Sequence, residues 1–93
     1  MEKNNLTLSL LTIQHASENY ALEGRHDLGS VVASLNHEAS GLLYEDVLGD
    51  INRVSEQAMI LITGRAEIGN EVVLYDEVAS LCSRIIHSLN ELT

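Results

Sequence analysis

The chain has 93 residues, enough for one small domain, and its apolar fraction of 45% argues against intrinsic disorder. Fourteen carboxylates outnumber five lysine and arginine side chains, and the resulting net charge of −9 disfavours binding to nucleic-acid phosphates or to an anionic membrane surface. One cysteine, Cys82, cannot form an internal disulfide, and no apolar run reaches the roughly 18–20 residues of a membrane span, so we expect a cytoplasmic protein.

The first segment, residues 5–23, has a pattern that fits two structures. Its first leucines alternate with polar residues, as in a strand, but a lone strand has nothing to pair with in this chain. We therefore favour a helix, which has two apolar faces and must be covered on both sides. One face consists of Leu6, Leu10, Ile13 and Tyr20, and the opposite face of Leu8, Leu11 and Leu22, with His15 between the last two.

The next two segments, residues 27–40 and 45–63, have the spacing of amphipathic helices. The Asp27 carboxylate can cap the first of them, and Gly64 follows the second at the position where glycine is favoured. The two apolar stripes consist of Leu28, Val31, Val32, Leu35, Ala39 and Leu42 in the first helix, and of Val47, Ile51, Val54, Ala58, Leu61 and Ile62 in the second.

The last segment, residues 71–91, has the clearest helical pattern. Asn70 can cap it, and the short connection at 65–69 suits an antiparallel hairpin with the preceding helix. Residues 1–93 therefore predict a single all-α domain, a small antiparallel four-helix bundle. Because the first helix has a surplus apolar face, we also expect a homodimer. The stripe of the last helix consists of Leu74, Val78, Leu81, Ile85, Leu89 and Leu92.

No combination of side chains predicts catalysis or a bound metal or cofactor. None of the four histidines has the spacing of a zinc signature, and the glycines are isolated rather than grouped in a phosphate-binding loop. Cys82 falls on the apolar face of the last helix, where nothing nearby in sequence would lower its pKa. We therefore expect no catalytic, cofactor-binding or metal-binding residues, and no enzyme activity.

Carboxylates gather on the last two predicted helices. Glu45, Asp46 and Asp50 lie along residues 45–63, while Asp76 and Glu77 follow the start of residues 71–91. Their negative field extends over about one Debye length, roughly 8–10 Å. These residues form either a solvated face or a docking site for a basic partner.

The surplus apolar face of the first helix and the negative net charge both favour binding to another protein over direct binding to nucleic acid or membrane. The first hypothesis is a non-enzymatic interaction module, such as a small helical adaptor, chaperone or regulatory subunit that engages its partner through apolar helix faces. The alternative is an acidic inhibitor, such as an antitoxin, immunity protein or phage anti-defence protein, that occupies a basic nucleic-acid-binding surface of its target. The predicted partner-binding residues are Leu8, Leu11, His15, Leu22, Glu45, Asp46, Asp50, Asp76 and Glu77.

Overall fold

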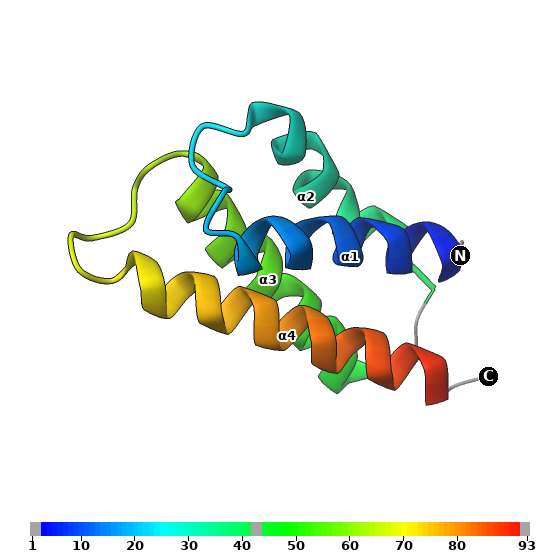
Figure 1. Ribbon diagram of the computed structural model, residues 1–93. Helices are drawn as coiled ribbons and strands as arrows, with labels where there is room; N and C mark the ends of the chain where they lie inside the picture. Colours follow the sequence, from blue (N-terminus) through cyan, green and yellow to red (C-terminus); the bar gives the residue numbers. More distant parts are fainter. Residues whose placement is uncertain (1–2, 42–43, 92–93) are drawn as a thin grey trace.

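The computed structural model describes residues 3–41 and 44–91, and within them the chain forms a bundle of four α-helices (Figure 1). α1 packs against α2 and α4, and α3 packs against the same two helices, with helices that follow one another in sequence running antiparallel. The predicted all-α bundle is confirmed, and the strand alternative for residues 5–13 is wrong because they lie within α1. The helices are α1 (Lys3–Glu18), α2 (His26–Glu38), α3 (Glu45–Ile62) and α4 (Glu71–Glu91).

Each helix turns its apolar stripe towards the centre of the bundle. Leu10, Leu35, Ile51 and Ile85, one from each helix, are fully buried. Burial of an aliphatic side chain of this size contributes about 1.5–3 kcal/mol, so these stripes account for most of the driving force for folding. Tyr75 is the one aromatic side chain in the described core, which is otherwise aliphatic.

α1 ends at Glu18, five residues before its predicted end, because Tyr20 adopts a left-handed conformation with φ of 53°. The Ala21 N–H donates to the Ala16 carbonyl at 2.8 Å, and the Tyr20 N–H donates to the Ser17 carbonyl at 3.0 Å. These two bonds form the Schellman motif that usually ends a helix with glycine. The predicted end at residue 23, next to Gly24, is therefore wrong.

This early end overturns two side-chain predictions. Leu22 was predicted on the second apolar face of the first helix, but it lies in the α1–α2 connection and is fully buried. Tyr20 was predicted on the same apolar face as Leu6, Leu10 and Ile13, but its side chain is 54% exposed whereas theirs are buried. Both changes follow from the reversal of the chain at Tyr20, which breaks the helical spacing that linked these residues to Leu11 and Ile13.

The second helix begins one residue before its predicted start, so Asp27 does not occupy the N-cap position. α2 begins at His26, its N-cap residue is Arg25, and that residue makes no side-chain cap hydrogen bond. The Asp27 carboxylate instead lies in the first turn, where it accepts two hydrogen bonds from the Arg25 guanidinium at 2.9 and 3.0 Å. These hydrogen bonds lower the pKa of Asp27, and the nearby positive charge acts in the same direction.

The other helix ends lie close to their predicted positions. α2 and α3 end within two residues of the predicted limits, and α4 has its predicted bounds. No helix in the described part of the chain combines the length and apolar character that crossing a membrane requires. Two residues of the predicted stripes, Leu42 and Leu92, lie outside the described residues.

Candidate functional site

The outer face of α1 keeps part of the predicted apolar surface. Leu8 is 61% exposed and Leu11 is 46% exposed, and His15 lies one turn further along the same exposed face. With Leu22 buried, this surface consists of Leu8, Leu11 and His15, and we call it the α1 strip. It is smaller than the sequence predicts.

The α1–α2 and α3–α4 connections lie together at one end of the bundle (Figure 1). The Gly24 N–H donates to the Ile62 carbonyl at 2.9 Å, which joins the first connection to the end of α3. The Tyr75 hydroxyl accepts hydrogen bonds from the backbone N–H groups of Leu22 and Glu23, which joins the same connection to α4. Residues far apart in the sequence therefore share one surface here.

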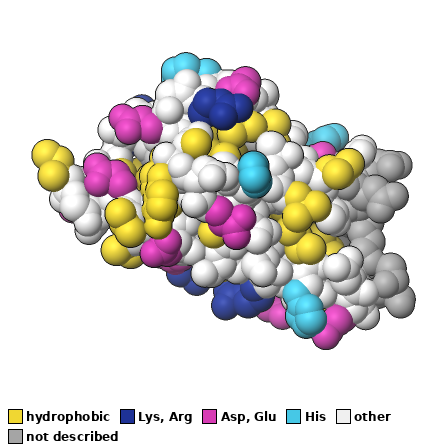
Figure 2. Space-filling view, viewed as in Figure 1, with side chains coloured by type: hydrophobic (Ala, Val, Ile, Leu, Met, Phe, Trp, Pro, Cys, Tyr) yellow, Lys and Arg dark blue, Asp and Glu magenta, His cyan; other side chains and the backbone are white. Residues whose placement is uncertain are grey.

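Large apolar side chains are exposed at this end, where Figure 2 shows hydrophobic and acidic side chains interspersed at the left of the view. Ile68, in the α3–α4 connection, is fully exposed, and Val72 and Val73 in the first turn of α4 are 55% and 60% exposed. Tyr20 packs edge-on against Tyr75, with ring centroids 5.3 Å apart, so it lies at the same end of the bundle as the start of α4. We call Tyr20, Ile68, Val72 and Val73 the turn-end surface.

Sequence reasoning missed the turn-end surface, although two signals for it were present. Val72 and Val73 fall off the stripe that begins at Leu74, and Ile68 lies between two glycines that mark a connection. Each signal is weak alone, because single exposed apolar residues are normal on soluble proteins. Only the adjacency of the two connections brings these residues to the same end of the bundle.

An apolar groove runs beside Val73. Its volume is about 340 Å³, and Ile60, Ala66 and Leu74 supply half-buried apolar side chains to its lining. Glu67, Asn70 and Arg65 supply the polar part of the lining. Across Ala66 lies a much smaller hollow of about 20 Å³, lined by Glu23, Leu61, Gly64, Ala66, Glu71 and Tyr75.

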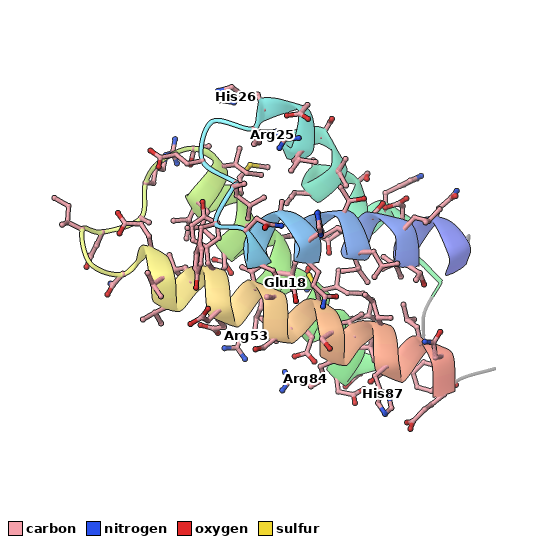
Figure 3. The ribbon with its side chains drawn as sticks, in the orientation of Figure 1. Glu18, Arg25, His26, Arg53, Arg84 and His87 are labelled. Atoms are coloured by element: carbon pink, nitrogen blue, oxygen red, sulfur yellow. The ribbon has the colours of Figure 1, made fainter. Side chains whose placement is uncertain are left out.

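Two of the predicted acidic docking residues are held in ion pairs between α3 and α4. The Arg84 guanidinium donates to both carboxylate oxygens of Asp50 at 2.8 and 3.0 Å, and this contact raises the pKa of Arg84. Glu77 accepts from Arg53 at 2.8 Å and from Gln57 at 3.0 Å. Figure 3 shows the two arginines along the lower side of α4.

The other three predicted acidic residues have a different environment. Glu45, Asp46 and Asp76 are exposed, and none of them forms an ion pair with a side chain that the structure describes. Glu45 and Asp46 lie in the first turn of α3, whereas Asp76 lies close to the turn-end surface on α4. The structure therefore does not bring the five predicted carboxylates together in one site.

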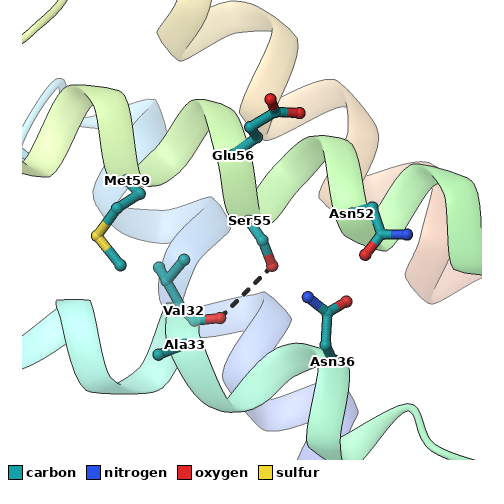
Figure 4. Close-up of a pocket in the computed structure, with 7 residues that line it drawn as sticks. All are labelled: Val32, Ala33, Asn36, Asn52, Ser55, Glu56 and Met59. Atoms are coloured by element: carbon teal, nitrogen blue, oxygen red, sulfur yellow. Dashed lines mark hydrogen bonds between the residues drawn. The ribbon is translucent and has the colours of Figure 1, made fainter.

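Further grooves lie between neighbouring helices in the described part of the chain. The groove between α2 and α3, about 430 Å³, is lined by residues that include Asn36, Asn52 and Met59, and the Ser55 hydroxyl donates to the Val32 carbonyl at 3.5 Å within it (Figure 4). No histidine or cysteine lines this groove.

The groove between α1 and α4, about 530 Å³, is polar. Glu18, Arg84 and His87 line it (Figure 3), but His87 pairs with Glu91 at 3.0 Å and Arg84 pairs with Asp50. No hydrogen bond between a serine and His87 is formed among the side chains described there. Over residues 3–41 and 44–91, no three histidine, cysteine, aspartate or glutamate side chains are placed to hold a metal ion.

Cys82 is fully buried, as its position on the apolar face predicts. Burial raises the pKa of its thiol to about 12, because the thiolate would lose its hydration. A nucleophilic role requires the opposite shift, so the structure gives Cys82 the environment of a core residue.

Comparison with known proteins adds no relative to this description. The sequence matches no protein-family model, and no curated protein or solved structure matches the chain.

Proposed function

We propose that this chain is a non-enzymatic protein-binding module and that the turn-end surface is its main contact with a partner. The main support for the proposal is that four large apolar side chains lie at one end of the bundle and that each is more than half exposed. They are Tyr20, Ile68, Val72 and Val73. Most of the aliphatic stripe residues are buried, whereas these four large apolar side chains stay exposed at the same end of the bundle. Exposed apolar surface of this kind on a soluble protein favours an interaction site.

The composition of the turn-end surface supports this role. Tyrosine is enriched among the residues that carry most of the binding energy at interfaces, because it combines large area with low conformational entropy. Tyr20 is already held against Tyr75 by its edge-on ring contact, so little side-chain freedom is lost when a partner covers it. The apolar groove beside Val73 provides a recess for a partner side chain.

The α1 strip supports a second contact, self-association. Leu8 and Leu11 are three residues apart on one helical face, and a two-fold contact between copies would cover both. Sedimentation across a broad concentration range tests this homodimer. We expect the double variant Leu8→Asp/Leu11→Asp to sediment as a monomer at concentrations where the wild type associates, and a monomeric wild type would remove this part of the proposal.

The acidic-inhibitor alternative has weaker support. Such an inhibitor presents free carboxylates in place of phosphates, but Asp50 and Glu77 are bound to arginines of the same chain. The free carboxylates Glu45 and Asp46 lie in the first turn of α3, in a different element from Asp76 on α4. We therefore propose that the negative charge modulates the affinity for a partner but does not provide most of it.

Affinity capture with matched variants tests the main proposal. The wild-type chain, Ile68→Asp/Val73→Asp and Leu8→Asp/Leu11→Asp would be used as baits in lysate from the cells that make the protein. All four replaced side chains are exposed, Ile68 and Val73 at 100% and 60% and Leu8 and Leu11 at 61% and 46%, so each double variant exchanges two exposed apolar side chains for aspartate.

We expect at least one protein to be retained by the wild type and by the α1 variant but lost by the turn-end variant. Loss with both variants, or retention by both, would show that the turn-end surface is not the main contact. Circular dichroism of all three baits verifies that the helices remain formed.

A further inference from the structure

We infer that the apolar groove beside Val73 binds an apolar side chain from a partner segment whose neighbouring residues are lysine or arginine. This inference rests on the proposed function and adds to it the chemistry of the partner. It follows from the shape of the groove and from the charges around it.

The shape of the groove limits what can enter it. Its volume of about 340 Å³ is at the low end of the roughly 300–1,000 Å³ typical of ligand pockets. Ile60, Ala66, Val73 and Leu74 offer apolar contacts in its lining. The groove therefore suits one or two aliphatic side chains of a segment that lies across the end of the bundle.

The surroundings of the groove are acidic. Glu67 lines the groove itself, and Glu23 and Glu71 line the small hollow on the other side of Ala66. Asp76 follows Val73 by three residues and so lies on the adjacent turn of α4. Arg65 is the one basic side chain among the residues described as lining the two hollows.

The carboxylates around the groove favour a basic partner over a second copy of this chain. A partner with basic residues beside its apolar anchor would be attracted by Glu67 in the groove lining and by the neighbouring carboxylates, because the field of each charge extends over about a Debye length, roughly 8 Å at physiological salt. A second copy of this chain would bring the same carboxylates and a net charge of −9 to the contact, so like charges would oppose it. The occupant of this groove is therefore a different, basic protein segment.

Two synthetic helical peptides form the first test. Both carry the same leucines on one face, and they differ only in the flanking positions, which are lysine in one peptide and glutamate in the other. Fluorescence anisotropy with the full chain at physiological salt measures their affinities. We expect the lysine peptide to bind at least about tenfold more tightly and to lose affinity as salt is raised.

Equal affinity for the two peptides, or no binding of either, overturns the inference. If both peptides bind equally and Val73→Asp weakens both, the groove binds apolar segments without regard to charge, and the proposed function stands. The affinity capture tests the proposed function separately from these peptide measurements.

Charge-reversal variants provide the second test. Glu67→Lys/Glu71→Lys should weaken binding of the lysine peptide about tenfold, because Glu67 lines the groove and Glu71 lines the small hollow on the other side of Ala66. The matched control, Glu45→Lys/Asp46→Lys, makes the same change in net charge in the first turn of α3. We expect the control to change affinity by less than about twofold at physiological salt. An equal loss with both variants would indicate attraction to overall charge rather than to this groove, and would contradict the inference.

Discussion

The hydroxyl of Tyr75 accepts a hydrogen bond from the backbone N–H of Leu22 at 3.1 Å, across 53 positions of sequence. The N–H of Glu23 donates to the same oxygen at 3.2 Å. One side chain of α4 thus satisfies two backbone donors in the α1–α2 connection, next to the point where Tyr20 reverses the chain. This arrangement fixes the connection against α4 and gives the turn-end surface a rigid base.

Replacing Tyr75 with phenylalanine should destabilise the fold without changing the number of helices. The buried Leu22 N–H would lose its acceptor, and an unsatisfied buried donor costs about 1–3 kcal/mol. Urea unfolding followed by circular dichroism measures the change in free energy. Tyr20→Phe is the control, because the Tyr20 side chain is largely exposed, and we expect it to change stability by less than about 0.5 kcal/mol.

Truncation of two nearby leucines of α1 should change the stability of the fold to very different extents. Leu10 is fully buried, so Leu10→Ala removes packed methyl groups and leaves a cavity, with an expected loss of about 2–5 kcal/mol. Leu8 is 61% exposed, and Leu8→Ala should lie within about 0.5 kcal/mol of the wild type. Chemical denaturation of both variants tests which face of α1 packs inward, and similar losses at the two positions would contradict the helix orientation.

The contact between Arg84 and Asp50 should contribute modestly to the packing of α3 on α4. The contact is bidentate, but the Arg84 side chain is 60% exposed, so solvent and salt screen it. A double-mutant cycle with Arg84→Ala and Asp50→Ala should give a small favourable coupling free energy that decreases as salt is raised. A coupling that does not change with salt would contradict an electrostatic origin.

Cys82 should make the fold less stable in alkaline solution. The pKa of its thiol is raised from 9.0 to about 12 in the folded chain, so the unfolded chain releases this proton first as the pH rises. Since the folded state then binds more protons than the unfolded state, the free energy of unfolding falls between pH 9.0 and about 12. Denaturation at several pH values should show a smaller fall in Cys82→Ala than in the wild type.

The same burial predicts slow reaction of Cys82 with iodoacetamide at pH 8. Alkylation should become fast only in denaturant, where the thiol is exposed and ionises at its ordinary pKa. Fast alkylation of the native protein would show that Cys82 is accessible and would contradict its place in the core.

The sequence by itself determined the all-helical class and the inward face of the last three helices, whereas it left two apolar faces open for the first. The spacing of Ile51, Val54 and Ala58 repeats at the helical period, and all three are fully buried. Gly64 marked the end of α3 because glycine readily adopts the left-handed conformation, and its φ is 69°. These features depend on residues within one helix or next to it, so they can be read from a local pattern.

Only the tertiary structure decided where α1 ends and what the candidate surface contains. Tyr20 takes the left-handed position that glycine usually fills, supported by its ring contact with Tyr75. The pairing of Asp50 with Arg84 depends on how α3 and α4 align, and the turn-end surface depends on two connections meeting at one end. These contacts join residues that lie far apart in the chain, and they depend on how the helices pack. The spacing of residues within a single helix therefore cannot predict them.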